Sequence, residues 1–153
     1  MFSMRHEFPS EWYRFLHPAV AGAEQILAFT LGKDRFPFFV QDRTVVVMQI
    51  DVLANTTKSM DYHAILSYVT HDPPATTTSS ELTLPEDPDY DNLNVKTIGV
   101  ADAGLALDEL NIDAPMTLKL KASNVTPYTA LTTNPDEVED LFIVMHYKLA
   151  LVP

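Results

Sequence analysis

The hydrophobic positions of this chain recur with a period of two, which is the spacing of a β-strand that has one buried face. The alternation is clearest in three segments, 44–53, 115–122 and 141–151. In the last of these, one face carries Leu141, Ile143, Met145, Tyr147, Leu149 and Leu151. The opposite face carries Phe142, Val144, His146, Lys148 and Ala150. The pattern predicts that 141–151 is the central strand of a sheet.

Weaker alternation predicts further strands at 25–31, 36–40, 62–69, 81–84 and 95–100. Together these segments make about eight short strands, spaced as in all-β domains. We therefore predict an antiparallel β-sandwich, jelly-roll-like, with at most one or two short helical turns, one of them within 102–111. The Pro-rich and polar segments 72–80 and 85–92 are predicted to be exposed loops.

The length of 153 residues is that of one domain, 1–153, which can bury a single core. Hydrophobic residues make up 46% and charged residues 20%, as in a packed globular domain. Only 4 Gly accompany 11 Pro, so we expect rigid turns and no flexible linker between domains.

The net charge of −11 repels phosphate backbones and anionic membrane surfaces, which disfavours a nucleic-acid partner. No apolar run approaches the roughly 20 residues that span a bilayer, so we predict a soluble chain that inserts in no membrane by itself. The first ten residues lack the plan of a signal peptide. The expected location is the cytoplasm at synthesis, with release as part of a larger complex as a further option.

The residue types that carry chemistry do not form a recognisable site. The chain has no Cys, and its five His show no short metal-binding spacing. No Ser has a Gly-X-Ser-X-Gly setting, and the four Gly form no phosphate loop. The acidic segment 86–92 lacks the Gly and Glu of a calcium loop, so a solvated loop is favoured over a weak cation site. We predict no catalytic residue, no metal and no cofactor.

Two aromatic segments are the candidates for binding. Segment 5–18 has four aromatic residues beside two Arg, and such side chains often anchor interfaces. The arm 1–18 either contacts a partner or folds back over one end of the sandwich. Segment 35–39 is predicted to be an edge strand because of Pro37, with its Phe residues either in the core or against another chain. The predicted binding residues are Trp12, Tyr13, Arg14, Phe15, Arg35, Phe36 and Phe38.

Three segments in this order carry a family resemblance: 8–16 (FPSEWYRFL), 33–39 (KDRFPFF) and 138–147 (VEDLFIVMHY). They resemble the C-terminal region of the large subunit of bacterial Tc insecticidal toxin complexes and their neuraminidase-like relatives. In that region, too, an acidic turn leads into a closing strand. The resemblance implies a β-sandwich that assembles within, or docks onto, a larger toxin machine, and it implies no catalytic residue. The family subunits are giant channel-forming chains, so it implies here an excised domain, a split subunit or a reused sandwich.

Three functions follow as hypotheses, in this order. The first is a non-catalytic assembly or partner-binding module of a toxin-like or injection-type bacterial system, whose partner is another protein or a second copy. The alternative is a carbohydrate-binding module in which Trp12, Tyr13 or Tyr90 stacks on a sugar. The third is a small hydrolase that uses His63 or His71 with the acids of 87–91.

Overall fold

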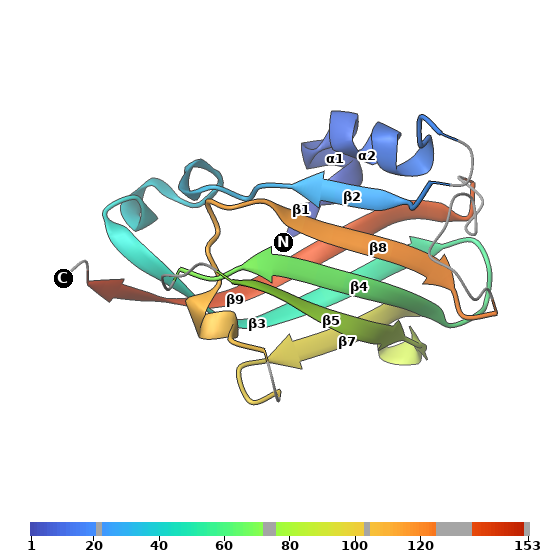
Figure 1. The fold of residues 1–153 in the computed structure, drawn as a ribbon. Helices are drawn as coiled ribbons and strands as arrows, with labels where there is room; N and C mark the ends of the chain where they lie inside the picture. The colour runs from blue at the N-terminus through green and yellow to red at the C-terminus, as the bar shows by residue number, and fades with distance from the viewer. Residues whose placement is uncertain (21–22, 72–75, 103–104, 125–135, 152–153) are drawn as a thin grey trace.

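Two antiparallel sheets pack face to face in the computed structural model, which describes residues 1–20, 23–71, 76–102, 105–124 and 136–151 (Figure 1). The five-stranded sheet has the order β1 (Phe2–Ser3), β9 (Val138–Leu151), β3 (Arg43–Thr56), β7 (Leu93–Gly99) and β6 (Glu86–Asp87). The four-stranded sheet has the order β2 (Ile26–Phe29), β8 (Met116–Ala122), β4 (Tyr62–Val69) and β5 (Thr77–Leu84). The predicted all-β antiparallel sandwich is confirmed.

The two longest strands, β3 and β9, pair from Arg43 opposite Leu151 to Thr56 opposite Val138. A bulge between Val47 and Gln49 interrupts this register and bends β3 locally. The sheet order places β3 in the middle of the sheet and β9 next to the two-residue β1. The prediction that 141–151 is the central strand is therefore wrong, because alternation reports which face is buried and not which strands are neighbours.

One hydrophobic core draws on both sheets and on the N-terminal segment. Among the largest side chains that are fully buried are Tyr62, Tyr68 and Phe15. The buried amide of Asn94 on β7 donates from Nδ2 to the carbonyls of Leu84 on β5 (2.9 Å) and Met60 (2.8 Å). Its Oδ1 accepts from the Thr56 hydroxyl at 3.0 Å. These bonds satisfy a polar group inside the core and connect the two sheets.

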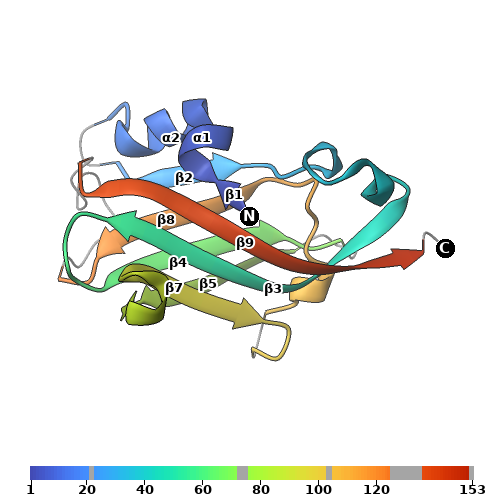
Figure 2. The same ribbon diagram turned by 180° about the vertical axis from the view of Figure 1, so that it is seen from behind.

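The arm 1–18 folds back as β1 and two short helices, α1 (Met4–Glu7) and α2 (Pro9–Leu16). The Ser3 hydroxyl accepts from the His6 backbone N–H and caps α1, and Pro9 suits the first turn of α2. Figures 1 and 2 show the helices along one side of the sandwich, where α2 contacts β2 and α1 contacts β9. The arm therefore covers the gap between the edges of the two sheets.

Two local predictions are wrong. Segment 36–40 is not a strand, because Pro37 leads into a 3-10 turn, η2 (Phe38–Val40). Another 3-10 turn, η1 (Lys33–Arg35), follows Gly32 (φ 67°) just before the segment. The predicted loop 76–80 belongs largely to β5, which is an edge strand. Its polar residues here are alternately exposed and half-buried. The predicted exposed loop 85–92 is largely exposed, as expected, and contains the two-residue β6 and a 3-10 turn, η3 (Pro88–Tyr90).

The helical hint within 102–111 corresponds to a single 3-10 turn, η4 (Leu107–Glu109). Residues 103–104 of that segment and 72–75 of the predicted loop lie outside the described residues.

Candidate functional site

Three of the predicted binding residues lie in the core. Trp12 is 6% exposed and packs on the fully buried Phe15, with ring centroids 5.5 Å apart. Phe36 is also buried and contacts Phe2 and Tyr147 edge-on, at centroid distances of 5.9 and 5.1 Å. These rings hold the arm and the 33–40 segment onto the sandwich, so they present no surface to a partner of the folded chain.

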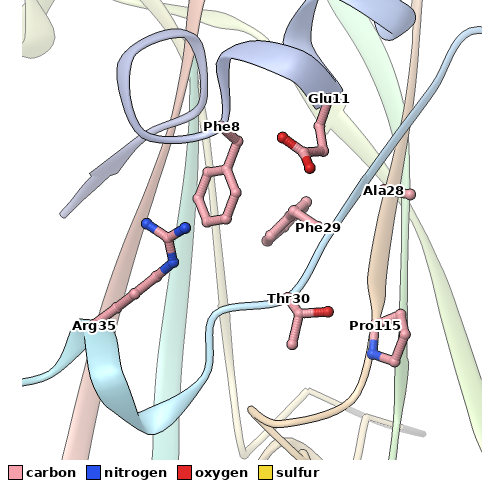
Figure 3. Close-up of a pocket in the computed structure, with 7 residues that line it drawn as sticks. All are labelled: Phe8, Glu11, Ala28, Phe29, Thr30, Arg35 and Pro115. Atoms are coloured by element: carbon pink, nitrogen blue, oxygen red, sulfur yellow. The ribbon is translucent and has the colours of Figure 1, made fainter.

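Arg35 connects the two predicted segments. Its guanidinium carbon lies 4.1 Å from the centroid of the Phe8 ring, and Nη1 lies 3.9 Å from Oε2 of Glu7. A pocket of about 300 Å³ opens here, and Figure 3 shows Arg35 and Glu11 on either side of the rings of Phe8 and Phe29. Its lining residues are Phe8, Glu11, Ala28, Phe29, Thr30, Arg35 and Pro115. The floor of this pocket is aromatic, and a carboxylate and a guanidinium lie on either side of it. Such a pocket suits a short polar segment of another molecule.

An exposed aromatic pair lies on the second 3-10 turn. Phe38 is 86% exposed and Phe39 is 60% exposed, and their rings meet edge-on at 6.1 Å. The turn is fixed because Val40 is fully buried and the Gln41 side chain donates to the Lys33 carbonyl at 2.6 Å. These two contacts anchor the turn, so the rings of Phe38 and Phe39 are held exposed to water.

The structure separates the predicted residues into distinct surfaces. Tyr13 and Arg14 are exposed on α2, and Tyr13 stacks on His17 at 4.4 Å. Figure 1 shows the segment that contains Phe38 at the end where β3 begins and β9 ends, whereas α2 lies toward the other end. Phe39 lies in the predicted edge segment 35–39 but was not among the individually predicted binding residues.

A cross-strand polar group lies on the outer face of the five-stranded sheet. Nε2 of His146 is 2.9 Å from Oδ2 of Asp51, and Oδ1 of Asp51 accepts from Thr97 Oγ1 (2.8 Å) and Gln49 Nε2 (2.9 Å). Serine hydrolase chemistry needs a hydroxyl on the second ring nitrogen. Here the Thr97 hydroxyl is bound to the carboxylate, and no described side chain is hydrogen-bonded to Nδ1 of His146. The group therefore holds three strands together without an assembled nucleophile.

The Asp51 group gives a pH-dependent prediction. Burial raises the pKa of Asp51, but hydrogen bonds from Thr97, His146 and Gln49 outweigh it and keep the pKa below the ordinary 3.8. A carboxyl whose folded pKa is lowered stabilises the fold above its unfolded pKa, and this contribution is lost as pH falls through the lowered value. Asp51→Asn should therefore reduce the free energy of unfolding near neutral pH, and the difference from wild type should shrink below about pH 4. Urea unfolding across this range checks the result, and a difference that stays constant would contradict it.

The other candidate groups are not brought together. Nδ1 of His63 lies 3.9 Å from Oε1 of Glu81, and the backbone N–H of His71 donates to the Glu109 carbonyl. None of their described contacts is with the acids of 87–91. In that segment Asp87 caps η3, and its neighbours form a tight turn. Within the described ranges, no three His, Asp or Glu side chains are grouped so as to hold a metal ion.

Comparison of this chain with protein families, with curated proteins and with solved structures gives no match. The class of the protein is therefore set by the fold itself, an antiparallel β-sandwich with a helical side arm. Of the helices in the described part of the chain, none has the length and apolarity to cross a bilayer.

Proposed function

We propose that this chain is a non-catalytic partner-binding or assembly module whose central contact is the Phe38–Phe39 pair. The observation that carries the proposal is the exposure of both rings, 86% and 60%, on an ordered turn. Exposed apolar groups of this size are unfavourable in water, and aromatic anchors are frequent centres of binding interfaces. The Arg35 pocket belongs to the same segment and supplies charged groups at its rim.

The biological setting proposed is a toxin-like or injection-type bacterial assembly in which the chain, synthesised in the cytoplasm, acts within a larger complex. The support is the resemblance of 8–16, 33–39 and 138–147, since the second segment contains the exposed pair. The net charge of −11 favours a partner surface that is basic or neutral.

Replacing the exposed pair tests this function. Phe38→Ser with Phe39→Ser should weaken association by about tenfold or more, because the substitutions remove the apolar surface that a partner would bury. Sedimentation velocity at two concentrations would measure self-association. Co-purification from the native host, quantified against wild type, would measure binding to other proteins.

The matched control is Tyr90→Ser, since Tyr90 is also an exposed aromatic residue on a 3-10 turn, 51% exposed, but on η3. The control should behave as wild type in both assays. If the Phe38 and Phe39 variant retains wild-type sedimentation and the same co-purified proteins, this surface is not the contact.

The carbohydrate alternative depends on residues other than Trp12, because a 6% exposed indole offers no free face. Tyr13 keeps one free face beside its stack on His17, and Tyr90 is half exposed. A glycan array, followed by fluorescence of the single Trp next to Tyr13, would detect a sugar. Quenching that Tyr13→Ala abolishes would favour this alternative.

A further inference from the structure

The edge of β9 that faces away from β3 is covered along only half of its length. β1 pairs with Phe142 and Ile143 alone. Just before them, Asp140 accepts from the Ser3 hydroxyl and the Arg5 backbone N–H, and the Arg5 guanidinium donates to the Glu139 carbonyl. From Met145 to Leu151, no described strand pairs with this edge. Such an edge leaves backbone N–H and C=O groups available to another strand.

The open half of the strand also carries an uncovered apolar row. Leu149 is 39% exposed and Leu151 is 74% exposed, although they lie on the same face of β9 as the buried Ile143 and Met145. A hollow of about 210 Å³ lies beside this edge. It is lined by Met1, Phe2, Glu7, Arg35, Phe36, Pro37, Met145 and Tyr147. No Pro interrupts 145–151, and Lys148 is its only Lys or Arg.

We propose that a second copy of this chain adds its own β9 antiparallel to this edge, with Lys148 on the two-fold axis. The two five-stranded sheets then form one continuous sheet. The inference rests on the proposed assembly function and names a partner for this end of the molecule. It is a case of strand addition in which both strands are the same segment.

The register follows from the geometry of β9. Pairing about Lys148 sets Met145 opposite Leu151 and Tyr147 opposite Leu149 of the second copy, so that apolar residues of the inner face meet each other. Among the described residues, β1 pairs only with Phe142 and Ile143, and the unpaired part of this edge from Met145 to Leu151 has the length of the proposed pairing. The segment is thus complementary to itself over seven residues.

Charge sets the conditions for this pairing. Each copy has a net charge of −11, so salt should strengthen association by screening the repulsion. The contact strand itself has no carboxylate between Met145 and Leu151. The two Lys148 side chains meet at the axis on the outer face, where water surrounds them, and Lys148→Ser should tighten the dimer.

Sedimentation equilibrium tests the pairing with variants that leave the core intact. Wild type should show a monomer–dimer equilibrium, and Leu149→Lys with Leu151→Lys should weaken it by about tenfold or more. The matched control is Val20→Lys with Val100→Lys, at sites 66% and 40% exposed, and it should dimerise as wild type. A wild type that stays monomeric in moderate salt, or a Leu149 and Leu151 variant that dimerises normally, would overturn the proposal.

A disulfide tests the register, because the chain has no Cys of its own. Lys148→Cys should form a disulfide with the same residue of the second copy, since opposite Cβ atoms lie about 4.5–5.5 Å apart and a small shift closes the bond. Ala150→Cys should not, because its two copies would be four residues apart, about 13 Å. Cross-linking of Ala150→Cys but not of Lys148→Cys would overturn this register.

The Phe38 and Phe39 variant separates the two proposals. If Lys148→Cys cross-links while that variant loses no association in any assay, strand pairing stands and the aromatic contact fails. If the aromatic variant loses association while the Leu149 and Leu151 variant does not, strand pairing fails and the proposed function stands.

Discussion

Replacing Trp12 by alanine is expected to lower the free energy of unfolding by about 3–5 kcal/mol, the usual cost of removing a large buried ring. The indole is 6% exposed, packs on Phe15, and lies on the helix that contacts β2. Its loss leaves a cavity between the helical arm and the sandwich. Urea unfolding followed by far-ultraviolet circular dichroism measures the effect, because Trp12 is the only tryptophan.

The neighbouring Tyr13→Ala is the matched control. Tyr13 is 63% exposed and contacts His17 within the same short segment, so we expect a loss below about 1 kcal/mol. Equal losses for the two variants would mean that the arm is not part of the core. A Trp12 substitution therefore cannot report on binding, which is tested at Phe38 and Phe39 instead.

Asp140→Ala is expected to cost about 3 kcal/mol, because it removes three hydrogen bonds to a carboxylate that is only 6% exposed. Asp140 accepts from Ser3 Oγ (2.5 Å), the Arg5 backbone N–H (3.0 Å) and the Leu141 backbone N–H (2.8 Å). The first two bonds join the arm to β9. Urea unfolding gives the total loss, and hydrogen exchange at residues 2–7 shows where the structure opens.

Glu139→Ala separates this role from a general effect of charge. The exposed Glu139 accepts from Asn55 Nδ2 at 3.0 Å and should contribute less than about 1 kcal/mol. A loss for Asp140→Ala no larger than that for Glu139→Ala would show that the carboxylate does not anchor the arm.

The sequence predicts the strands well where burial is one-sided. Segment 62–69 matches β4, and 115–122 differs from β8 by one residue. Buried and half-buried side chains alternate along the whole of β4 and through the first five residues of β8. The order of the strands in each sheet was not predictable in the same way, because it depends on contacts between residues that are far apart in the sequence. The sequence predicted only the second half of β5, 81–84. The first half, 77–80, consists of Thr and Ser alone, so it shows no alternation of apolar and polar residues.

The N-terminal helices had a signal that period-two analysis does not detect. Met4, Phe8, Trp12 and Phe15 recur every three or four residues, and all four are buried. Three of these residues, Phe8, Trp12 and Phe15, also belong to the aromatic segment 5–18, and such a cluster favours a binding surface only if its rings are exposed.

The site contacts depend on pairing across the fold. His146 and Asp51 are 95 residues apart in the sequence, and only the register of β3 with β9 brings them together. Alternation placed His146 on the less apolar face but could not supply its partner. The contact of Arg35 with Phe8 likewise needs the fold of both segments.

The amide of Asn94 determines how the two layers sit on each other along the strand direction. Its Nδ2 donates to a carbonyl of β5 and to the Met60 carbonyl between β3 and β4, while Asn94 itself belongs to β7. A displacement of one layer by a single residue would break both of these bonds and leave the buried Nδ2 hydrogens of Asn94 without acceptors. The two bonds of this side chain therefore favour the observed alignment of the two layers over a displaced one.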